Sequence, residues 1–350
     1  MHKKLIVLFI LCIFILCIPI KALAFESDLS GSTGYATHQL DAKDTIDGKT
    51  IFKVEPGKSF CIIQEEKDYW LIKYDDKIGY IKYEDCMINL PDVEPSIYYE
   101  ITNSEHSIFK TSGKSIYGLT GVKLYDFDKS YNSKIDRIEY IVPITYDTAK
   151  LISQAQQLAV KNGYSLKIYD SYRPKSITKL ASAKLCDASL VDPDISDGLT
   201  VYEEDGKSYY WGSSWFLAST VSTHNCGAAI DVTLVDLYTR QEVKMQSPMH
   251  ELSTRSVKYL SGGSTQFVGI ATEETKLMNT IFTEVGMEGL ASEWWHYQDN
   301  KAYKRILNST GGCDFQIKDQ CSVTSYEALS WIGVYIKPTP KNILNRHRMR

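Results

Sequence analysis

Two histidines and one aspartate form a pattern that could hold a metal ion. His224 and Asp231 are seven residues apart, and His296 lies in the run Ser-Glu-Trp-Trp-His-Tyr that begins at Ser292. Apolar residues alternate over 229–234, which predicts a strand with Asp231 on its polar face. Two histidines and a carboxylate bind zinc with one coordination position open for water, as in catalytic sites. The sequence therefore predicts one Zn²⁺ per chain, held by these three residues.

A zinc-bound water needs a base, and the anionic oxygen formed during hydrolysis needs a positive partner. Glu293 lies three residues before His296, close enough to serve the same water without binding the metal. Arg173, in the run Tyr-Asp-Ser-Tyr-Arg-Pro, could supply the positive charge. We therefore predict that Glu293 and Arg173 are the catalytic residues of a metal-dependent hydrolase.

Hydrophobic periodicity predicts the helices and strands that position these residues. Apolar residues recur at helical spacing over 148–162 and 272–285, and Pro174 suits the first turn of a third helix. Residues 164–169 predict a strand that ends at the Tyr-Arg-Pro turn, and residues 191–210 are expected to form an acidic surface loop. Helices flanking an antiparallel sheet give an α+β domain.

Together these motifs resemble those of the zinc D-alanyl-D-alanine dipeptidases of vancomycin resistance, within the wider group of zinc D,D-peptidases. The resemblance rests on S-x-H-x-x-G-x-A-x-D over 222–231, E-W-W-H-Y over 293–297 and Y-R-P over 172–174, and it covers about residues 89–303. It implies a hedgehog-like catalytic domain over residues 91–340. The implied reaction is hydrolysis of a peptide ending in D-Ala-D-Ala, or of that free dipeptide.

The resemblance also implies residues that contact the substrate. Ser222 matches a family residue with that role. In the dipeptidase branch an aspartate, nineteen residues after the aspartate ligand, holds the substrate ammonium group, and His250 takes its place here. A tyrosine of the same pocket aligns with Asn103. Because a histidine lacks a carboxylate's attraction for ammonium, we expect less confinement to the free dipeptide. D,D-carboxypeptidase activity on peptidoglycan stem peptides is the alternative.

The N-terminus has the features of a secretory signal peptide. A basic start, an apolar run over 5–20 and the small residues Ala22 and Ala24 predict cleavage after residue 24. An uncleaved membrane anchor is the alternative, although the apolar run is short for a bilayer. The chain is therefore expected to be secreted, extracellular or associated with the cell wall.

The cysteine content fits an oxidising compartment. Six cysteines follow residue 24, and an even number in a secreted chain permits three disulfides. Free buried thiols are the alternative. The expected pairs are Cys313 with Cys321, which close a short loop, Cys61 with Cys86, and Cys186 with Cys226.

Residues 45–90 show a different pattern. Short β-rich runs separated by turn residues predict a small all-β barrel, and the W-x-x-x-Y motif over 70–74 followed by Gly-Tyr-Ile resembles a bacterial SH3-like domain that binds cell walls. A β-subdomain that only packs on the enzyme is the alternative. Around it we expect a flexible lead-in over 25–44, a stiff linker over 91–95 and a basic tail over 341–350.

The overall charge excludes one class of partner and leaves another class of function open. A formal net charge of −4 over 350 residues gives no indication of nucleic-acid binding. A non-catalytic, zinc-containing protein that binds cell walls is the alternative to an enzyme. Such a protein would be expected to lose the base or the arginine, and this chain keeps both Glu293 and Arg173.

Overall fold

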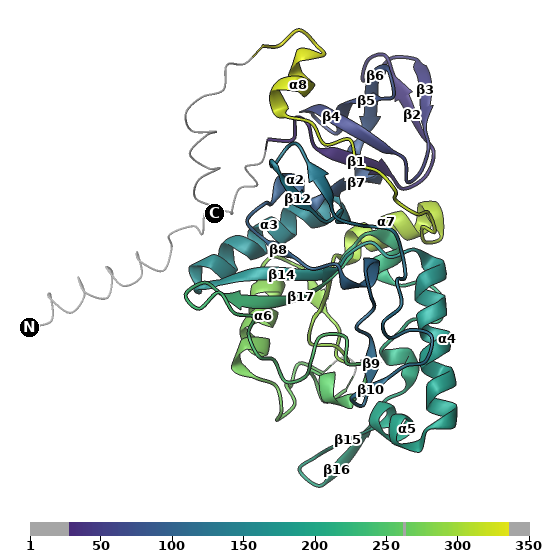
Figure 1. The fold of residues 1–350 in the computed structure, drawn as a ribbon, viewed down its shortest axis with the longest axis vertical. Coiled ribbons are helices and arrows are strands. Elements are labelled where there is room, and N and C mark those ends of the chain that lie inside the picture. Colours follow the sequence, from purple (N-terminus) through teal and green to yellow (C-terminus); the bar gives the residue numbers. More distant parts are fainter. Residues whose placement is uncertain (1–27, 262–263, 336–350) are drawn as a thin grey trace, which may run out of the picture.

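Two β-sheets with helices packed around them form the structure, a computed structural model that describes residues 28–261 and 264–335 (Figure 1). The predicted signal segment over 1–24 and the basic tail over 341–350 lie outside the described residues. Within the described part, no helix is long and apolar enough to cross a bilayer.

The larger sheet has eight strands, and every adjacent pair is antiparallel. Its core is apolar: Ile62, Trp70, Ile72 and Ile81 are fully buried. In sheet order the strands are β13 (Pro143–Thr145), β7 (Cys86–Asn89), β1 (Thr33–Ala36), β4 (Ser59–Glu66), β5 (Tyr69–Tyr74), β6 (Lys77–Lys82), β2 (Leu40–Lys43) and β3 (Thr50–Val54).

Three expectations for the N-terminal part are corrected by this sheet. The predicted lead-in over 25–44 contains β1 and β2, and all of β1 is buried between β4 and β7. The predicted linker over 91–95 begins with a buried helical turn, α2 (Leu90–Val93), in which Asp92 accepts a hydrogen bond from the backbone of Thr33 (2.7 Å). Among the described strands no pairing joins β3 to β13, so the sheet is not closed into the predicted barrel.

The second sheet has five strands and carries most of the predicted motifs. It is antiparallel except for the parallel pair of β8 and β14, which supports the predicted α+β class with an antiparallel sheet. In order the strands are β18 (Glu288–Gly289), β19 (His296–Gln298), β17 (Ala229–Asp236), β14 (Tyr164–Asp170) and β8 (Tyr98–Tyr99).

Helices α3 (Tyr146–Lys161) and α6 (Glu273–Glu284) contact this sheet and each other. Buried apolar residues of α3 recur three or four positions apart, at Ile152, Ala155 and Ala159, so one face of the helix is apolar. Thr272 caps α6 by accepting a hydrogen bond from the backbone of Thr275 (3.2 Å). Both helices agree with the predicted ranges.

The predicted acidic loop over 191–210 is wrong, because this segment is folded. After α4 (Lys175–Val191) come α5 (Pro193–Thr200) and a hairpin of β15 (Val201–Glu204) and β16 (Lys207–Tyr210). Asp192 caps α5 through a hydrogen bond from the backbone of Asp194. Asp205 and Gly206 both have positive φ, as a two-residue hairpin turn requires. In Figure 1 this hairpin lies at the opposite end of the molecule from β2 and β3.

Short elements complete the fold. They are η1 (Tyr83–Asp85), η2 (Thr102–Ser104), β9 (Lys110–Thr111), β10 (Lys114–Ser115), β11 (Ser130–Asn132), β12 (Arg137–Glu139), η3 (Ser213–Trp215), η4 (Thr223–Cys226), η5 (Thr254–Ser256), α7 (Asn300–Thr310) and α8 (Ser325–Ser330).

One disulfide joins the two ends of the described chain. Cys61 on β4 pairs with Cys321, 260 residues later, with Cα atoms 5.4 Å apart. After α7 the chain returns to the larger sheet, where Val323 hydrogen-bonds to the backbone of Gly31 and α8 contacts β4. The three predicted pairings are therefore wrong, because this return path is not visible in cysteine spacing. The thiols of four cysteines are free: Cys86, Cys186, Cys226 and Cys313.

A lysine is buried beside the second sheet. Lys258 has no exposed surface, and its Nζ donates to Asn279 Oδ1 (2.9 Å) and lies 4.7 Å from the centroid of the Tyr297 ring. Burial lowers the pKa of Lys258 to about 7, from an ordinary value of 10.5. Between these two pH values the unfolded chain binds more protons than the folded chain, so the free energy of unfolding rises with pH over this window.

Replacing Lys258 with methionine is expected to remove this rise. Below about pH 7 the wild-type chain buries a charged amine, so Lys258→Met should increase the free energy of unfolding there by about 1–3 kcal/mol. The gain should shrink as pH approaches 10, where the lysine is uncharged in the folded state. Urea unfolding of both proteins at pH 6.5 and 9.5 measures this difference. The same gain at both pH values would contradict the interpretation.

Candidate metal centre

His224 is positioned by a short capped turn. In η4 the Ser222 hydroxyl accepts a hydrogen bond from the backbone of His224 (3.3 Å), and Asn225 Oδ1 accepts one from the backbone of Ser222 (2.8 Å). Gly227 ends the turn with a φ of +60°, and a Cβ atom there would lie 2.7 Å from Met87. Glycine is therefore required at the point where the chain turns from His224 into β17.

Sheet register brings Asp231 next to His296. On β17, Asp231 pairs with Asp170 of β14 on one side and with His296 of β19 on the other. Residues opposite one another on neighbouring strands have adjacent side chains. The strand pairing therefore joins a ligand to a residue 65 positions later in the chain.

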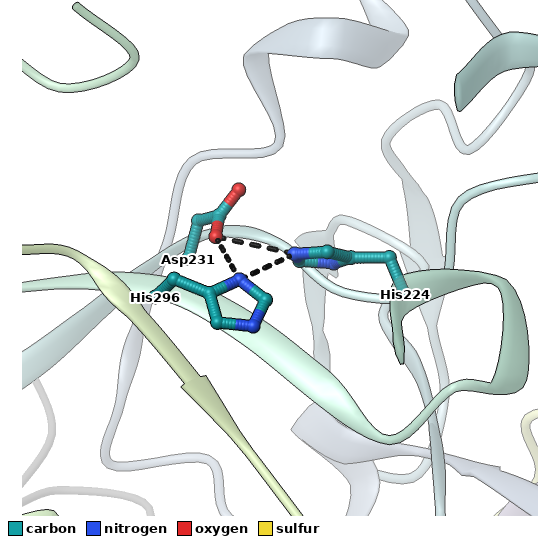
Figure 2. A group of neighbouring side chains, drawn as sticks. All are labelled: His224, Asp231 and His296. Atoms are coloured by element: carbon teal, nitrogen blue, oxygen red, sulfur yellow. Dashed lines mark hydrogen bonds and ion pairs between the residues drawn. The ribbon is translucent and has the colours of Figure 1, made fainter. Parts of the chain in front are cut away.

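The three predicted ligands point toward a common position (Figure 2). Asp231 Oδ1 lies 3.2 Å from His224 Nε2 and 3.3 Å from His296 Nδ1, and these two nitrogens are 3.1 Å apart. Ligands at about 2.0–2.2 Å from a tetrahedral zinc ion stand about 3.3–3.6 Å from one another. The observed separations are close to that spacing, and all three side chains are buried. The residues present therefore fit a metal ion.

Hydrogen bonds from the outer ring nitrogens orient both imidazoles. His224 Nδ1 lies 2.6 Å from the carbonyl oxygen of Ser171, which accepts its hydrogen and leaves Nε2 unprotonated. His296 Nε2 lies 3.0 Å from Gln298 Oε1, which leaves Nδ1 unprotonated. Burial also lowers the pKa of His296, which favours the uncharged ring that a metal binds. Each histidine thus presents a lone pair toward Asp231 Oδ1.

Glu293 lies beside the ligands. Its Oε2 is 3.9 Å from His296 Nδ1, and the side chain is almost wholly buried. Burial, and then the charge of Asp231, hold the pKa of Glu293 well above its ordinary value, while Arg173 acts in the opposite direction. A carboxyl group with a raised pKa can both accept and return a proton near neutral pH.

Arg173 is held by an acidic partner that sequence reasoning missed. Its Nη2 and Nε donate to Asp170 Oδ2 at 2.7 and 2.9 Å, and Nη2 lies 3.4 Å from Asp231 Oδ2. Asp170 also accepts a hydrogen bond from the Tyr125 hydroxyl (2.7 Å). The signal was available in the sequence, since Asp170 precedes Arg173 by three residues in the same motif.

The charges of this group compensate one another. Burial raises the pKa of Asp231, but the charge of His224 and hydrogen bonds from three histidines outweigh it and hold that pKa well below its ordinary value. Asp231 is thus an anion at neutral pH, as a metal ligand must be.

A cavity of about 490 Å³ opens over the ligands. Arg173, Glu293 and Ser222 lie in its wall together with the three ligands, and much of the remaining wall is apolar. Asp231 and Glu293 are the only carboxylates among its described lining residues.

The structure does not bring Asn103 and His250 to this cavity. Both side chains are fully buried. Asn103 Nδ2 donates to Asp170 Oδ2 (2.9 Å), and His250 Nε2 lies 3.0 Å from Asp231 Oδ2. Neither residue is among those that line the cavity. Of the three predicted substrate contacts, the cavity wall includes Ser222.

Residues 135–310, half of the chain, match the model of a peptidase family described as D-Ala-D-Ala dipeptidase. The chain belongs to this family of zinc metallopeptidases. The matched range contains Asp170, Arg173 and the three candidate ligands, and it excludes residues 45–90. The predicted family and the prediction of an enzyme are thus confirmed, whereas the SH3-like domain gains no support.

Characterised relatives agree with this assignment. The D-alanyl-D-alanine dipeptidase of Enterococcus faecium is 28% identical over 155 residues, which are 44% of this chain and 71% of that protein. The D-alanyl-D-alanine dipeptidase of Escherichia coli is 29% identical over 152 residues, 43% of this chain and 64% of that protein. A crystal structure of the vancomycin resistance D,D-pentapeptidase VanY with Zn(II) covers 60% of this chain and 96% of its own, with 12% identity and a TM-score of 0.27, too low to carry an argument.

Proposed function

We propose that the chain is a zinc-dependent D,D-peptidase that cleaves the bond between the two residues of a terminal D-Ala-D-Ala. The observation that carries this proposal is the convergence of His224, Asp231 and His296 at 3.1–3.3 Å, with Glu293 and Arg173 in the wall of the same cavity. The names of the relatives, D-alanyl-D-alanine dipeptidases, support the substrate class.

One zinc ion per chain would be held by His224 Nε2, Asp231 Oδ1 and His296 Nδ1. When bound, such an ion lowers the pKa of a water molecule toward neutrality and polarises a carbonyl group. The other roles belong to the chain itself. Glu293 accepts a proton at its carboxylate and returns it to the leaving amine. Arg173 places its positive charge at the cavity wall, where it stabilises the anionic oxygen that develops from the scissile carbonyl.

The lining of the cavity favours a second substrate beside the free dipeptide. Among its described lining residues, no carboxylate other than Asp231 and Glu293 is present to pair with the ammonium group of free D-Ala-D-Ala. Glu251, next to His250, does not fill this role, because its carboxylate accepts hydrogen bonds from the backbone of Gly113 (3.0 Å) and from Ser253 (2.9 Å). Dipeptidase activity remains the first assignment, and D,D-carboxypeptidase activity on stem peptides is the close alternative.

Three substrates test this proposal. We expect the zinc-loaded protein to hydrolyse D-Ala-D-Ala, its N-acetylated form and a stem pentapeptide ending in D-Ala-D-Ala, with kcat/KM values within about tenfold of one another. The reason is that an ion-paired hydrogen bond contributes about 1.5–3 kcal/mol, or about ten- to a hundredfold in affinity, only where the partner exists. Rapid cleavage of the free dipeptide with strong rejection of both blocked substrates would show that an ammonium site is present. Failure to cleave any of the three would contradict D,D-peptidase activity.

We also propose that the enzyme acts outside the cytoplasm in peptidoglycan metabolism. The signal-like first 24 residues and a disulfide between Cys61 and Cys321 support this location. A separable wall-binding role for residues 45–90 has less support, because their sheet extends into the catalytic segment through β13. Trp70 also packs edge-on against Tyr146 of α3 (4.9 Å between centroids). These contacts favour a subdomain that stabilises the enzyme.

A further inference from the structure

The two oxygens of Asp231 have different surroundings. Oδ1 faces His224 and His296, at the position proposed for the metal. Oδ2 points away from it, 3.0 Å from His250 Nε2 and 3.4 Å from Arg173 Nη2. The carboxylate therefore offers one oxygen to the metal and engages the other within the protein.

His250 is held firmly in this place. Its ring stacks on the ring of Phe109, with centroids 4.5 Å apart and planes inclined by 22°, and the edge of the contact with Trp295 closes another side. Its carbonyl oxygen accepts a hydrogen bond from the backbone of Lys110 (3.1 Å). The backbone φ of His250 is +58°, in the left-handed region that non-glycine residues rarely adopt. The fold thus maintains an uncommon backbone conformation that directs this ring at Asp231.

The role open to His250 is that of a hydrogen-bond donor. Asp170, Asp231 and His250 together could be taken for a second metal site. The Arg173 guanidinium already provides the positive charge for this group, since its Nη2 lies 2.7 Å from Asp170 Oδ2 and 3.4 Å from Asp231 Oδ2. His250 Nδ1 has no hydrogen-bond partner among the described residues. Its hydrogen therefore belongs on Nε2, where Asp231 Oδ2 accepts it.

We propose that His250 is a positioning residue that keeps Asp231 a one-oxygen ligand. The inference rests on the metal centre proposed above. A carboxylate with a free second oxygen can turn and bind a cation through both oxygens, which would take the coordination position needed for water. The hydrogen bond from Nε2 to Oδ2 prevents this turn and holds Oδ1 toward the histidines. Outer partners of this kind are worth about ten- to a hundredfold in metal affinity.

Three substitutions test the proposal without relying on turnover. His250→Phe retains an aromatic ring over Phe109 and removes the donor. His250→Asn also removes the contact, because its side chain is too short, and asparagine tolerates a positive φ. His250→Gln places an amide N–H near the position of Nε2 and serves as the matched control. Zinc affinity is measured by competition with a chelator, and the coordination number is followed by the visible spectrum of the Co²⁺-substituted protein.

We expect the Phe and Asn variants to bind zinc about ten- to a hundredfold more weakly than wild type, and the Gln variant to remain within about threefold. The Co²⁺ spectrum should change in the first two and not in the third. Wild-type affinity and an unchanged spectrum in both the Phe and Asn variants would overturn the proposal. So would a higher KM for free dipeptide with unaltered zinc affinity, the signature of direct substrate contact. Absence of zinc binding by the wild-type chain would contradict the metal centre and this inference with it, whereas failure to cleave D-Ala-D-Ala would contradict only the proposed function.

Discussion

Replacing Glu293 with glutamine is expected to leave zinc bound and to lower kcat by about 10²–10⁴-fold. Glutamine has the size of glutamate and can occupy the same buried position, 3.9 Å from His296 Nδ1. It cannot accept a proton, so the step that activates water loses its base. The candidate ligands are untouched, and the metal content should therefore remain that of wild type.

The experiment pairs single-turnover kinetics with metal analysis of the purified variant. Glu288→Gln is a matched control, because Glu288 is an exposed glutamate on β18 of the same sheet and should tolerate the change at full rate. A Glu293→Gln enzyme that turns over near the wild-type rate would show that the base is a different group. Loss of zinc from this variant would show that Glu293 is itself a ligand.

The parts of the site that could be predicted from the sequence lie within short motifs. The spacings from His224 to Asp231 and from Glu293 to His296 fix local geometry, because a capped turn and a strand place these side chains with little help from the rest of the chain. The approach of one motif to the other depends on the register of β17 with β19. Register is set by the packing of the whole sheet, so the motifs predicted which residues meet but not how.

Residues that act through burial were harder to predict. Asn103 and His250 were expected at the substrate because of their alignment, yet both side chains are fully buried. Nothing in the residue types themselves separates a polar side chain in a cavity wall from one that hydrogen-bonds to a buried carboxylate. The Cys61–Cys321 pair was missed for a related reason, since it depends on the path of the chain after α7. The hairpin over 201–210 was different, because the Asp192 cap and the Asp205-Gly206 turn were visible in the sequence.

Arg173 is expected to support both the fold and the rate. Its guanidinium is buried and balances Asp170 and Asp231, with three nitrogen–oxygen contacts of 2.7, 2.9 and 3.4 Å. Arg173→Met removes the charge and leaves two buried carboxylates without their partner, which should lower the free energy of unfolding by about 3–5 kcal/mol. The same change should lower kcat/KM by about 10²–10³-fold, the usual effect of removing a group that stabilises a developing oxyanion.

Arg173→Lys separates these two effects. Lysine keeps the positive charge, so the loss of stability should be smaller than for methionine. It cannot form the paired contact that Nε and Nη2 make with Asp170, so its ammonium group is not held at the same point and the rate should still fall. Arg137→Met is the control, because Arg137 forms a half-exposed ion pair with Glu139, worth less than about 1 kcal/mol. Urea unfolding and kcat/KM on D-Ala-D-Ala measure both effects. If Arg173→Lys keeps the wild-type rate, a positive charge anywhere near Asp170 suffices. If Arg173→Met keeps both stability and rate, the two carboxylates are neutralised by another group and the assigned role of Arg173 is wrong.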